Sequence, residues 1–231
     1  MALMKQAVIP EFFARLKKAI PEPETELEYD SVYQLLVAVV LSAQATDAGV
    51  NKATEPLFKK IKTPRQMITL GEKKLIDYIK SIGLYRMKAK NVIALSRLLI
   101  EKHGGEVPHT HEELQALPGV GRKTASVVLN ELRIEPAIAV DTHVFRVSHR
   151  LGLSSGKTPD HVEHDLMAIV PDELKTRAHH WLILHGRYTC KARKPECPRC
   201  VVADLCLFKA KTRPSDFIRP GAERSGGVDV P

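Results

Sequence analysis

All four cysteines of this 231-residue chain lie in one short segment, from Cys190 to Cys206. They follow the order Cys190-x6-Cys197-x2-Cys200-x5-Cys206, so a single loop can bring four thiols together. In a reducing compartment such clustering favours a metal or cluster site over disulfides. Four thiolates suit either Zn²⁺ or a [4Fe–4S] cluster. Zinc sites more often use two tight pairs, so the spacing favours iron–sulfur and leaves zinc open.

The sequence predicts a cytoplasmic protein with reduced thiols and no membrane partner. Its longest apolar run extends from Leu35 to Leu41, which is much shorter than the ~20 apolar residues that span a bilayer. The N-terminal residues Met1 to Gln6 lack the charged-then-apolar pattern of a signal peptide. Lys and Arg exceed Asp and Glu by 35 to 27, a net charge of +8. This excess is weak support for an anionic partner such as nucleic acid.

Apolar residues recur at helical spacing through nearly the whole chain, which predicts an all-α fold. No segment shows the sustained alternation of a strand. A helix is expected to begin at Asp30 or Ser31 and run through 35–41. The other expected helices are 11–20, 48–60, 71–81, 87–103, 111–116, 122–132, 142–151, 159–169 and 173–186.

One motif lies between two expected helices and reads Leu117-Pro-Gly-Val-Gly-Arg-Lys-Thr-Ala125. Gly119 and Gly121 predict a tight hairpin with torsions that other residues avoid, and they leave the main chain open to a ligand. The following helix begins near Gly121, so its free N–H groups can bind a DNA phosphate. An ordinary helix–helix turn is the alternative.

Two ionisable residues follow the hairpin glycines. Lys123 lies in the first turn of a helix, where the helix dipole and partial burial would lower its pKa. The neutral amine could then attack a sugar carbon and form a Schiff base. Asp141 precedes an apolar-periodic helix, either as its N-cap or as a carboxylate beside a reacting sugar. A solvated surface lysine is the plain alternative for Lys123.

Three cations lie between the first two cysteines: Lys191, Arg193 and Lys194. A loop held at both ends by cysteines would present these cations to phosphates. The alternative is an ordinary solvated run of charge.

Taken together, these motifs resemble the endonuclease III family of DNA glycosylases, over roughly residues 10–208. The resemblance implies that Lys123 is the catalytic lysine and Asp141 the catalytic aspartate. The cysteine spacing matches the family's [4Fe–4S] loop. The stretch Leu41-Ser-Ala-Gln-Ala-Thr-Asp47 is similar to the one whose glutamine, here Gln44, enters the DNA stack. In Ile82-Gly-Leu-Tyr85, Leu84 is similar to the second residue that wedges into the stack.

The same resemblance implies two helical domains that flank a DNA-binding cleft. A six-helix domain would cover 25–135 and end in the helix-hairpin-helix motif. An iron–sulfur domain would combine 1–24 with 136–209, and 210–231 would form a mobile tail. The hairpin is also expected to bind a monovalent cation.

The function implied is that of a bacterial-type bifunctional DNA glycosylase/AP lyase of base excision repair. A monomer would remove oxidised pyrimidines from damaged double-stranded DNA and cut the strand by β-elimination through a lysine Schiff base. Two alternatives stay open at this point. One is a monofunctional glycosylase for other lesions, and the other is a non-catalytic helix-hairpin-helix module with a structural metal such as zinc.

Overall fold

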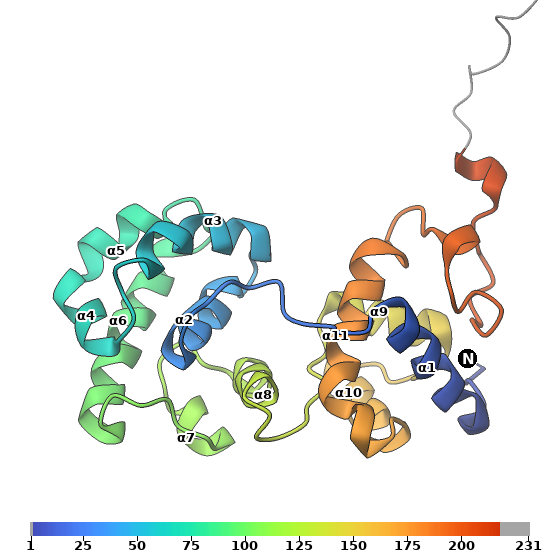
Figure 1. Cartoon of the computed structure of the whole chain (residues 1–231), viewed down its shortest axis with the longest axis horizontal. Helices are drawn as coiled ribbons and strands as arrows, with labels where there is room; N and C mark the ends of the chain where they lie inside the picture. The colour runs from blue at the N-terminus through green and yellow to red at the C-terminus, as the bar shows by residue number, and fades with distance from the viewer. Residues whose placement is uncertain (1, 218–231) are drawn as a thin grey trace, which may run out of the picture.

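The computed structural model describes residues 2–217, which form two helical lobes side by side (Figure 1). Across these residues the regular elements are helices and no strand occurs, so the all-α prediction is confirmed. The α-helices are α1 (Ile9–Ala19), α2 (Val32–Ser42), α3 (Asp47–Phe58), α4 (Pro64–Leu70), α5 (Glu72–Ile79), α6 (Tyr85–His103), α7 (His111–Gln115), α8 (Arg122–Glu131), α9 (Thr142–Leu151), α10 (Pro159–Ile169) and α11 (Asp172–Tyr188). Three 3-10 helices are η1 (Gln6–Val8), η2 (Cys197–Arg199) and η3 (Pro214–Phe217).

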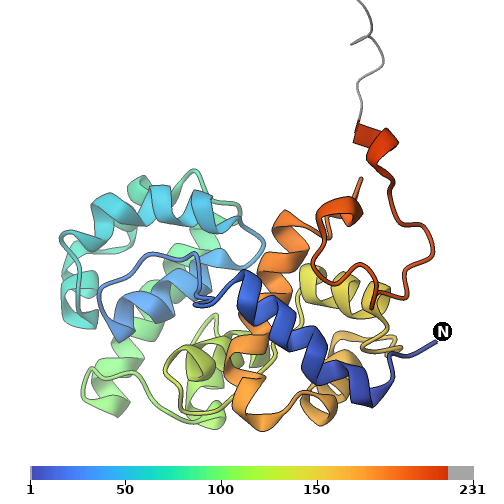
Figure 2. The same ribbon diagram turned by 45° about the vertical axis from the view of Figure 1, so that its right-hand side comes forward.

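Each lobe has its own hydrophobic core. The core of α2 to α8 draws its buried side chains from residues 27–129. The second core combines residues 4–16 with residues 138–202, so α1 packs against helices from the far end of the chain (Figure 2). The domain division expected from the sequence stays a prediction, and these two cores support it.

Trp181 ties the N-terminal helix into the second lobe. Its indole is fully buried, and Nε1 donates a hydrogen bond to the carbonyl of Ile20 at 2.8 Å. The ring of Phe13 lies beside it, with 6.1 Å between ring centroids. The cost of burying the indole N–H is therefore offset at the point where α1 ends.

Helix α2 fills the middle of the first lobe. Ser31 caps it by accepting a hydrogen bond from the Gln34 backbone, so Ser31 and not Asp30 begins this helix. The amide of Gln34 is buried and donates to the carbonyls of Phe58 and Ile61, at 3.0 and 2.8 Å. The helix ends at Ser42, and the loop that follows carries Gln44 to the boundary between the lobes.

Helix α4 was not among the expected helices. It has only 7 residues, too few for apolar periodicity to stand out. A capping box was nevertheless present in the sequence: Thr63 and Gln66 bond each other's backbone N–H groups, and Pro64 occupies the first turn. In the described part of the chain, no helix combines the length and apolarity needed to cross a membrane.

Candidate active site and cysteine cavity

Two adjoining cavities lie where the lobes meet, and Lys123 and Asp141 line both of them. The walls come from the loop between α2 and α3, from one face of α8, from the start of α9 and from α11. Two residues that are 18 positions apart therefore reach one site, because the connection from α8 to α9 crosses from the first lobe to the second (Figure 1).

Lys123 is the second residue of α8, and its side chain is exposed at the cavity. The surrounding walls partly desolvate the ammonium group and lower its pKa below the usual range, while the carboxylates of Asp141 and Asp47 raise it. Both carboxylates are engaged elsewhere. Asp141 Oδ1 accepts from the Val144 backbone at 2.7 Å, and Asp47 Oδ2 lies 2.7 Å from Arg187. Desolvation therefore prevails, and the amine loses its proton more readily than an ordinary lysine does.

Asp141 is both the N-cap of α9 and a wall of the cavity. The hydrogen bond to Val144 uses Oδ1, so a carboxylate has its second oxygen left for a ligand. The two interpretations of this residue therefore hold together.

The two hairpin glycines differ in whether their backbone torsions require glycine. Gly119 has φ +83°, and a Cβ there would lie 2.9 Å from Asn91 Nδ2 and 3.0 Å from Asn91 Cβ. Gly121 has φ −91° and ψ 176°, an extended conformation that any residue adopts. The expectation of special torsions is thus confirmed for Gly119 and wrong for Gly121. A Cβ at Gly121 would meet nothing within 4 Å, so the main chain at this position is open to approach.

Gln44 and Leu84 occupy neighbouring loops of the first lobe. Both have left-handed backbones, with φ of 55° and 59°. A Cβ on Gly83 would lie 3.9 Å from the Gln44 carbonyl, which places the two loops together. Leu84 is 53% exposed, and Gln44 is exposed at the cavity rim. Strained, exposed residues on paired loops are typical of functional sites.

Sequence reasoning missed the charged residues that bridge the lobes at the cavity. The guanidinium of Arg187 contacts Glu26 as well as Asp47, and all three residues line both cavities. Asp47 ends the stretch that contains Gln44, and Arg187 lies shortly before Cys190. Neither position carries a pattern that reveals its distant partner.

The cavity also has a histidine-lined side that the sequence analysis did not identify. His179 and His180 lie on α11 with their rings 5.1 Å apart, and both are buried. His180 Nε2 lies 2.7 Å from Glu131 Oε1, although the approach is too poorly aligned for a full hydrogen bond. Because Glu131 is on α8, this pair also crosses the lobe boundary.

A separate cavity in the second lobe is lined by all four cysteines, Cys190, Cys197, Cys200 and Cys206. Each thiol is free. Burial, with a smaller contribution from the other three thiols, raises the pKa of Cys200 to about 11. A bound metal group would supply the positive charge that keeps such thiolates deprotonated.

The cysteine cavity fits a multi-iron cluster better than a single ion. A zinc site closes its sulfurs to ~2.3 Å from the metal and leaves no space between them. Here the four cysteines line one cavity, and no three ligating side chains of the described residues meet around a single-ion site. The donor set and the space together suit a [4Fe–4S] cluster.

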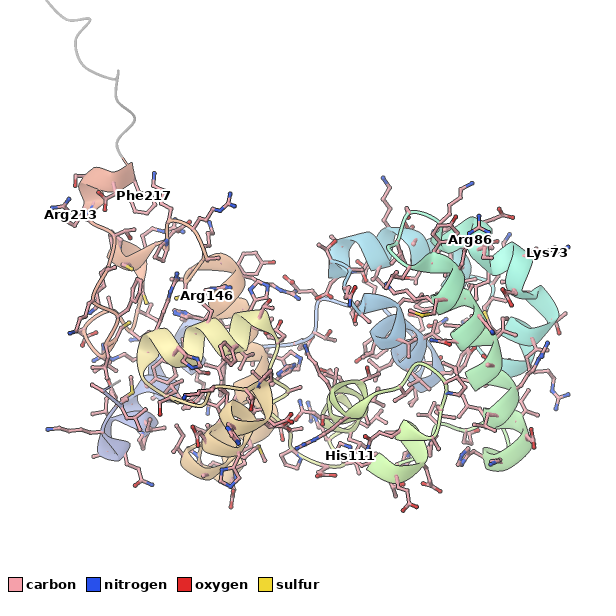
Figure 3. All side chains as sticks on the ribbon, turned by 180° about the vertical axis from the view of Figure 1, so that it is seen from behind. Lys73, Arg86, His111, Arg146, Arg213 and Phe217 are labelled. Carbon is pink, nitrogen blue, oxygen red and sulfur yellow. The ribbon has the colours of Figure 1, made fainter. Side chains whose placement is uncertain are left out.

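Arg150 and Arg146 hold the start of the cysteine loop. Arg150 donates to the carbonyls of Lys191 and Ala192 at 2.7 and 2.9 Å, and stacks on the ring of Phe208. Arg146, labelled in Figure 3, donates to the carbonyl of Cys190 at 3.1 Å. Their spacing on α9 is helical, but nothing in the sequence indicated this role.

The structure places the basic loop residues outside the cavity of Lys123. Lys191 pairs with Glu196 at 2.6 Å, and Lys194 Nζ lies 4.6 Å from the centre of the Phe217 ring. Arg193 is exposed on the same loop. Two of the three cations therefore have partners within the protein.

Residues 210–217 pack against the cysteine loop, where the sequence predicted a mobile tail. Thr212 accepts a hydrogen bond from the Cys197 backbone at 3.3 Å, and Lys211 Nζ donates to the Ala203 carbonyl at 2.6 Å. Figure 3 shows Phe217 at the end of the short helix η3 and Arg213 just before its start, on the same lobe as Arg146. The rest of the expected tail, 218–231, lies outside the described residues.

Comparison with known proteins yields matches along most of the chain. Residues 37–172 match the family model described as HhH-GPD superfamily base excision DNA repair protein. Residues 190–206 match the iron–sulfur binding domain of endonuclease III. Endonuclease III of Haemophilus influenzae is 56% identical over 201 residues, which cover 87% of this chain and 95% of that protein. Endonuclease III of Escherichia coli K12 is 53% identical over 208 residues, covering 90% and 99%.

Solved structures of endonuclease III also resemble this chain. A trapped endonuclease III–DNA covalent intermediate superposes with a TM-score of 0.83 at 47% identity, covering 89% of this chain and 97% of that one. A thermostable thymine-DNA glycosylase superposes with a TM-score of 0.76 over 88% and 95% of the two chains. Its identity of 24% shows a shared fold alone.

Proposed function

Because the chain belongs to the endonuclease III family, and is thus a base excision repair DNA glycosylase and AP lyase, we propose that Lys123 is its nucleophile and Asp141 its catalytic carboxylate. One observation carries this proposal: both side chains line the same interlobe cavities, and desolvation there lowers the pKa of Lys123. A neutral amine opposite a carboxylate is the arrangement that covalent attack on a sugar requires.

The partner is DNA, as it is for the endonuclease III solved in its complexes. Gly119 and Gly121 present backbone N–H groups at the start of α8 to a phosphate. Lys191, Arg193 and Lys194 add contacts to the phosphates from the second lobe. The hairpin carbonyls are also proposed to bind a monovalent cation.

Gln44 and Leu84 fill the space that an extruded nucleotide leaves. Their loops adjoin, so the two side chains can enter the stack at one place. Extrusion is needed because the sugar carbon cannot be reached inside the duplex, and a damaged base unstacks at lower energy.

The chemistry begins with the lone pair of Lys123 Nζ. It attacks the sugar C1′, the C1′–base bond breaks, and the base leaves with the electron pair and takes up a proton. The ring C1′–O4′ bond then opens to give a protonated Schiff base between Lys123 and C1′.

Asp141 supports the positive charge that builds on the sugar in the transition state and accepts a proton from the attacking amine. The Schiff base makes the hydrogens on C2′ acidic. Loss of one of them expels the 3′-phosphate and breaks the strand by β-elimination. Water then releases Lys123 from the Schiff base.

The iron–sulfur group belongs to the second lobe. Cys190, Cys197, Cys200 and Cys206 hold the [4Fe–4S] cluster indicated by the match to the endonuclease III iron–sulfur domain. When bound, the cluster supplies four metal–thiolate bonds that fix the loop carrying Lys191, Arg193 and Lys194. These comparisons set aside a non-catalytic module with a structural zinc.

The proposed substrates are oxidised pyrimidines and abasic sites in duplex DNA, cleaved in the cytoplasm of a bacterium. The support for a bacterial setting is that the relatives named above come from bacteria. A monofunctional glycosylase for other lesions would remove a base without needing Lys123 as nucleophile.

Borohydride trapping on an abasic duplex tests the assignment. The wild-type protein should form a covalent adduct and nick the strand without heat or alkali, and Lys123→Ala should do neither. Lys73→Ala is the matched control, because Lys73 is an exposed lysine on α5, away from the cavity (Figure 3). If Lys123→Ala is trapped as well as the wild type, the nucleophile is another residue.

A further inference from the structure

His185 is a buried residue of the cysteine cavity whose ring the proposed function does not use. It lies in the last turn of α11 and is only 4% exposed. The same cavity wall contains the four cysteines. Nε2 of the imidazole lies 3.8 Å from Sγ of Cys200, in hydrogen-bond contact with the sulfur. The ring is thus directed at one of the atoms that would hold the cluster.

The main chain of His185 holds a second cysteine of the set. Its carbonyl accepts hydrogen bonds from the backbone N–H groups of Thr189 and Cys190, at 3.0 and 2.7 Å. Cys190 and Cys200 are ten positions apart in the chain. One residue at the end of a helix therefore contacts two of the four ligands, the first through its backbone and the second through its ring.

The bound cluster decides which atom donates. A cysteine that ligates iron is a thiolate, which carries no hydrogen and can only accept a hydrogen bond. In the cluster-bound protein the contact therefore requires a hydrogen on Nε2 of His185, donated to Sγ of Cys200. Water is largely excluded from this ring, and a hydrogen bond to a charged acceptor is stronger in such surroundings.

Two other sulfurs of the cavity also have donors. Arg150 Nη1 lies 3.5 Å from Sγ of Cys190, and the backbone N–H of Phe208 lies 3.4 Å from Sγ of Cys206. The Arg150 guanidinium also holds the loop carbonyls, and the Phe208 donor belongs to the main chain. His185 therefore offers a side-chain donor that can be replaced without removing those loop contacts.

We propose that His185 donates its Nε2–H to the Cys200 sulfur of the assembled [4Fe–4S] site, and that this bond raises the reduction potential of the cluster and slows the loss of its iron. A donor to a cluster sulfur stabilises negative charge, so it favours the more reduced state. His185 is a positioning residue that contacts a ligand of the metal group and not the DNA. The inference rests on the assignment of the four cysteines to the cluster and is independent of the roles of Lys123 and Asp141.

Pulsed EPR of the intact cluster-containing protein tests the contact directly. The protein is labelled with ¹⁵N-histidine, and its cluster is made paramagnetic by reducing it with radiation in the frozen state. We expect a ¹⁵N coupling in the wild type, which His185 would supply, since in the described part of the chain no other histidine lines this cavity. The coupling should vanish in His185→Gln, whose new side chain is unlabelled. A wild-type spectrum without ¹⁵N coupling would overturn the inference.

Two variants separate the donor from the shape of the ring. His185→Phe keeps a flat ring but removes the donor, so the cluster's midpoint potential should become more negative. A chelator should remove its iron about tenfold faster, the effect typical of one hydrogen bond to a charged group. His185→Gln places an amide N–H near the position of Nε2 and should restore part of both properties. His164→Phe, at an exposed histidine on α10 of the same lobe, should match the wild type.

The outcomes are distinct. If His185→Phe keeps the wild-type potential and rate of iron loss, the inference is wrong. It is also wrong if His185→Gln behaves like His185→Phe, because the ring then acts through its packing alone. If His185→Phe fails to assemble a cluster, the EPR of the wild type and of His185→Gln still decides. Cluster-loaded variants should cleave an abasic duplex within about twofold of wild type. Failure of the wild type in that assay would overturn the proposed function and leave this inference standing.

Discussion

Arg187 Nη2 lies 2.7 Å from Asp47 Oδ2 and so joins α11 of the second lobe to the first turn of α3 in the other. The same guanidinium contacts Glu26, and both carboxylates are partly buried with it. These charges close the lobe boundary beside Lys123. The site is therefore held in shape by residues that do not themselves react.

Arg187→Leu should weaken this interlobe contact. It leaves two partly buried carboxylates without their cation, so the free energy of unfolding should fall by about 1–3 kcal/mol. Asp47→Asn should lower the free energy of unfolding much less in the Arg187→Leu protein than in the wild type, because Arg187, the partner of Asp47, is already absent. Urea unfolding of the wild type, the two single variants and the double variant measures the coupling between the two residues. Additive losses of stability would contradict an interlobe contact between Arg187 and Asp47.

The reaction rate should rise with pH through the titration of Lys123. Desolvation lowers the pKa of this amine, so the midpoint should lie below the ~10.4 of an ordinary lysine. Single-turnover trapping on an abasic duplex, run across pH, gives the midpoint. A midpoint at or above the ordinary value would show that the amine is not desolvated.

Lys123 also links stability to pH. Between its lowered folded pKa and its normal unfolded pKa, the unfolded chain binds more protons at this site, so its contribution makes stability rise with pH. Lys123→Met should remove that part of the slope and should not destabilise the protein. Thermal unfolding of the two proteins across the same pH range checks the sign.

Two substitutions at Asp141 separate its role as the N-cap of α9 from the effect of its negative charge. Asn is as good an N-cap as Asp, so Asp141→Asn should preserve stability, greatly reduce turnover and leave DNA binding nearly unchanged. Its lost carboxylate should also move the Lys123 midpoint to lower pH, because Asp141 raises that pKa. Asp141→Ala should lose about 1 kcal/mol in addition. Equal losses of binding and turnover in Asp141→Asn would indicate a structural cap only.

The hairpin offers a matched pair of glycine substitutions. Gly119→Ala adds a Cβ at φ +83° and 2.9 Å from Asn91, and should cost about 1–3 kcal/mol of stability. Gly121→Ala meets open space at an ordinary φ, so it should fold normally and weaken DNA binding. Unfolding measurements should therefore show a loss of stability for Gly119→Ala alone, and binding titrations should show weaker DNA binding by the stable Gly121→Ala variant. Unchanged DNA binding by Gly121→Ala would argue against the phosphate site.

The segment after residue 209 should help retain the cluster. Thr212→Val removes the acceptor for the Cys197 backbone and the donor to the Pro195 carbonyl. We expect faster loss of the iron–sulfur absorbance in the presence of a chelator, with unchanged folding of the first lobe. Thr69→Val, on exposed α4, serves as control. Equal bleaching rates would show that this segment does not protect the cluster.

Sequence patterns predicted the helices and the four-cysteine site because both are local signals. Helix α4 escaped because its signal is the capping box of Thr63 and Gln66 rather than apolar periodicity, which 7 residues are too few to show. The Arg187–Asp47 and His180–Glu131 pairs escaped for another reason: each depends on residues that meet only after both lobes have formed. Gly121 shows a third limit, since a glycine in the sequence does not reveal whether its torsion or its open surface matters.

The bond between Trp181 and Ile20 has a consequence for how this chain acquires its structure during synthesis. The two residues are 161 positions apart. At a ribosomal rate of ~5–20 residues per second, Trp181 is therefore synthesised roughly 8–32 s after Ile20 at the end of α1. Residues 27–129 emerge meanwhile as a contiguous unit with its own core. The first helix to leave the ribosome is therefore among the last to be buried.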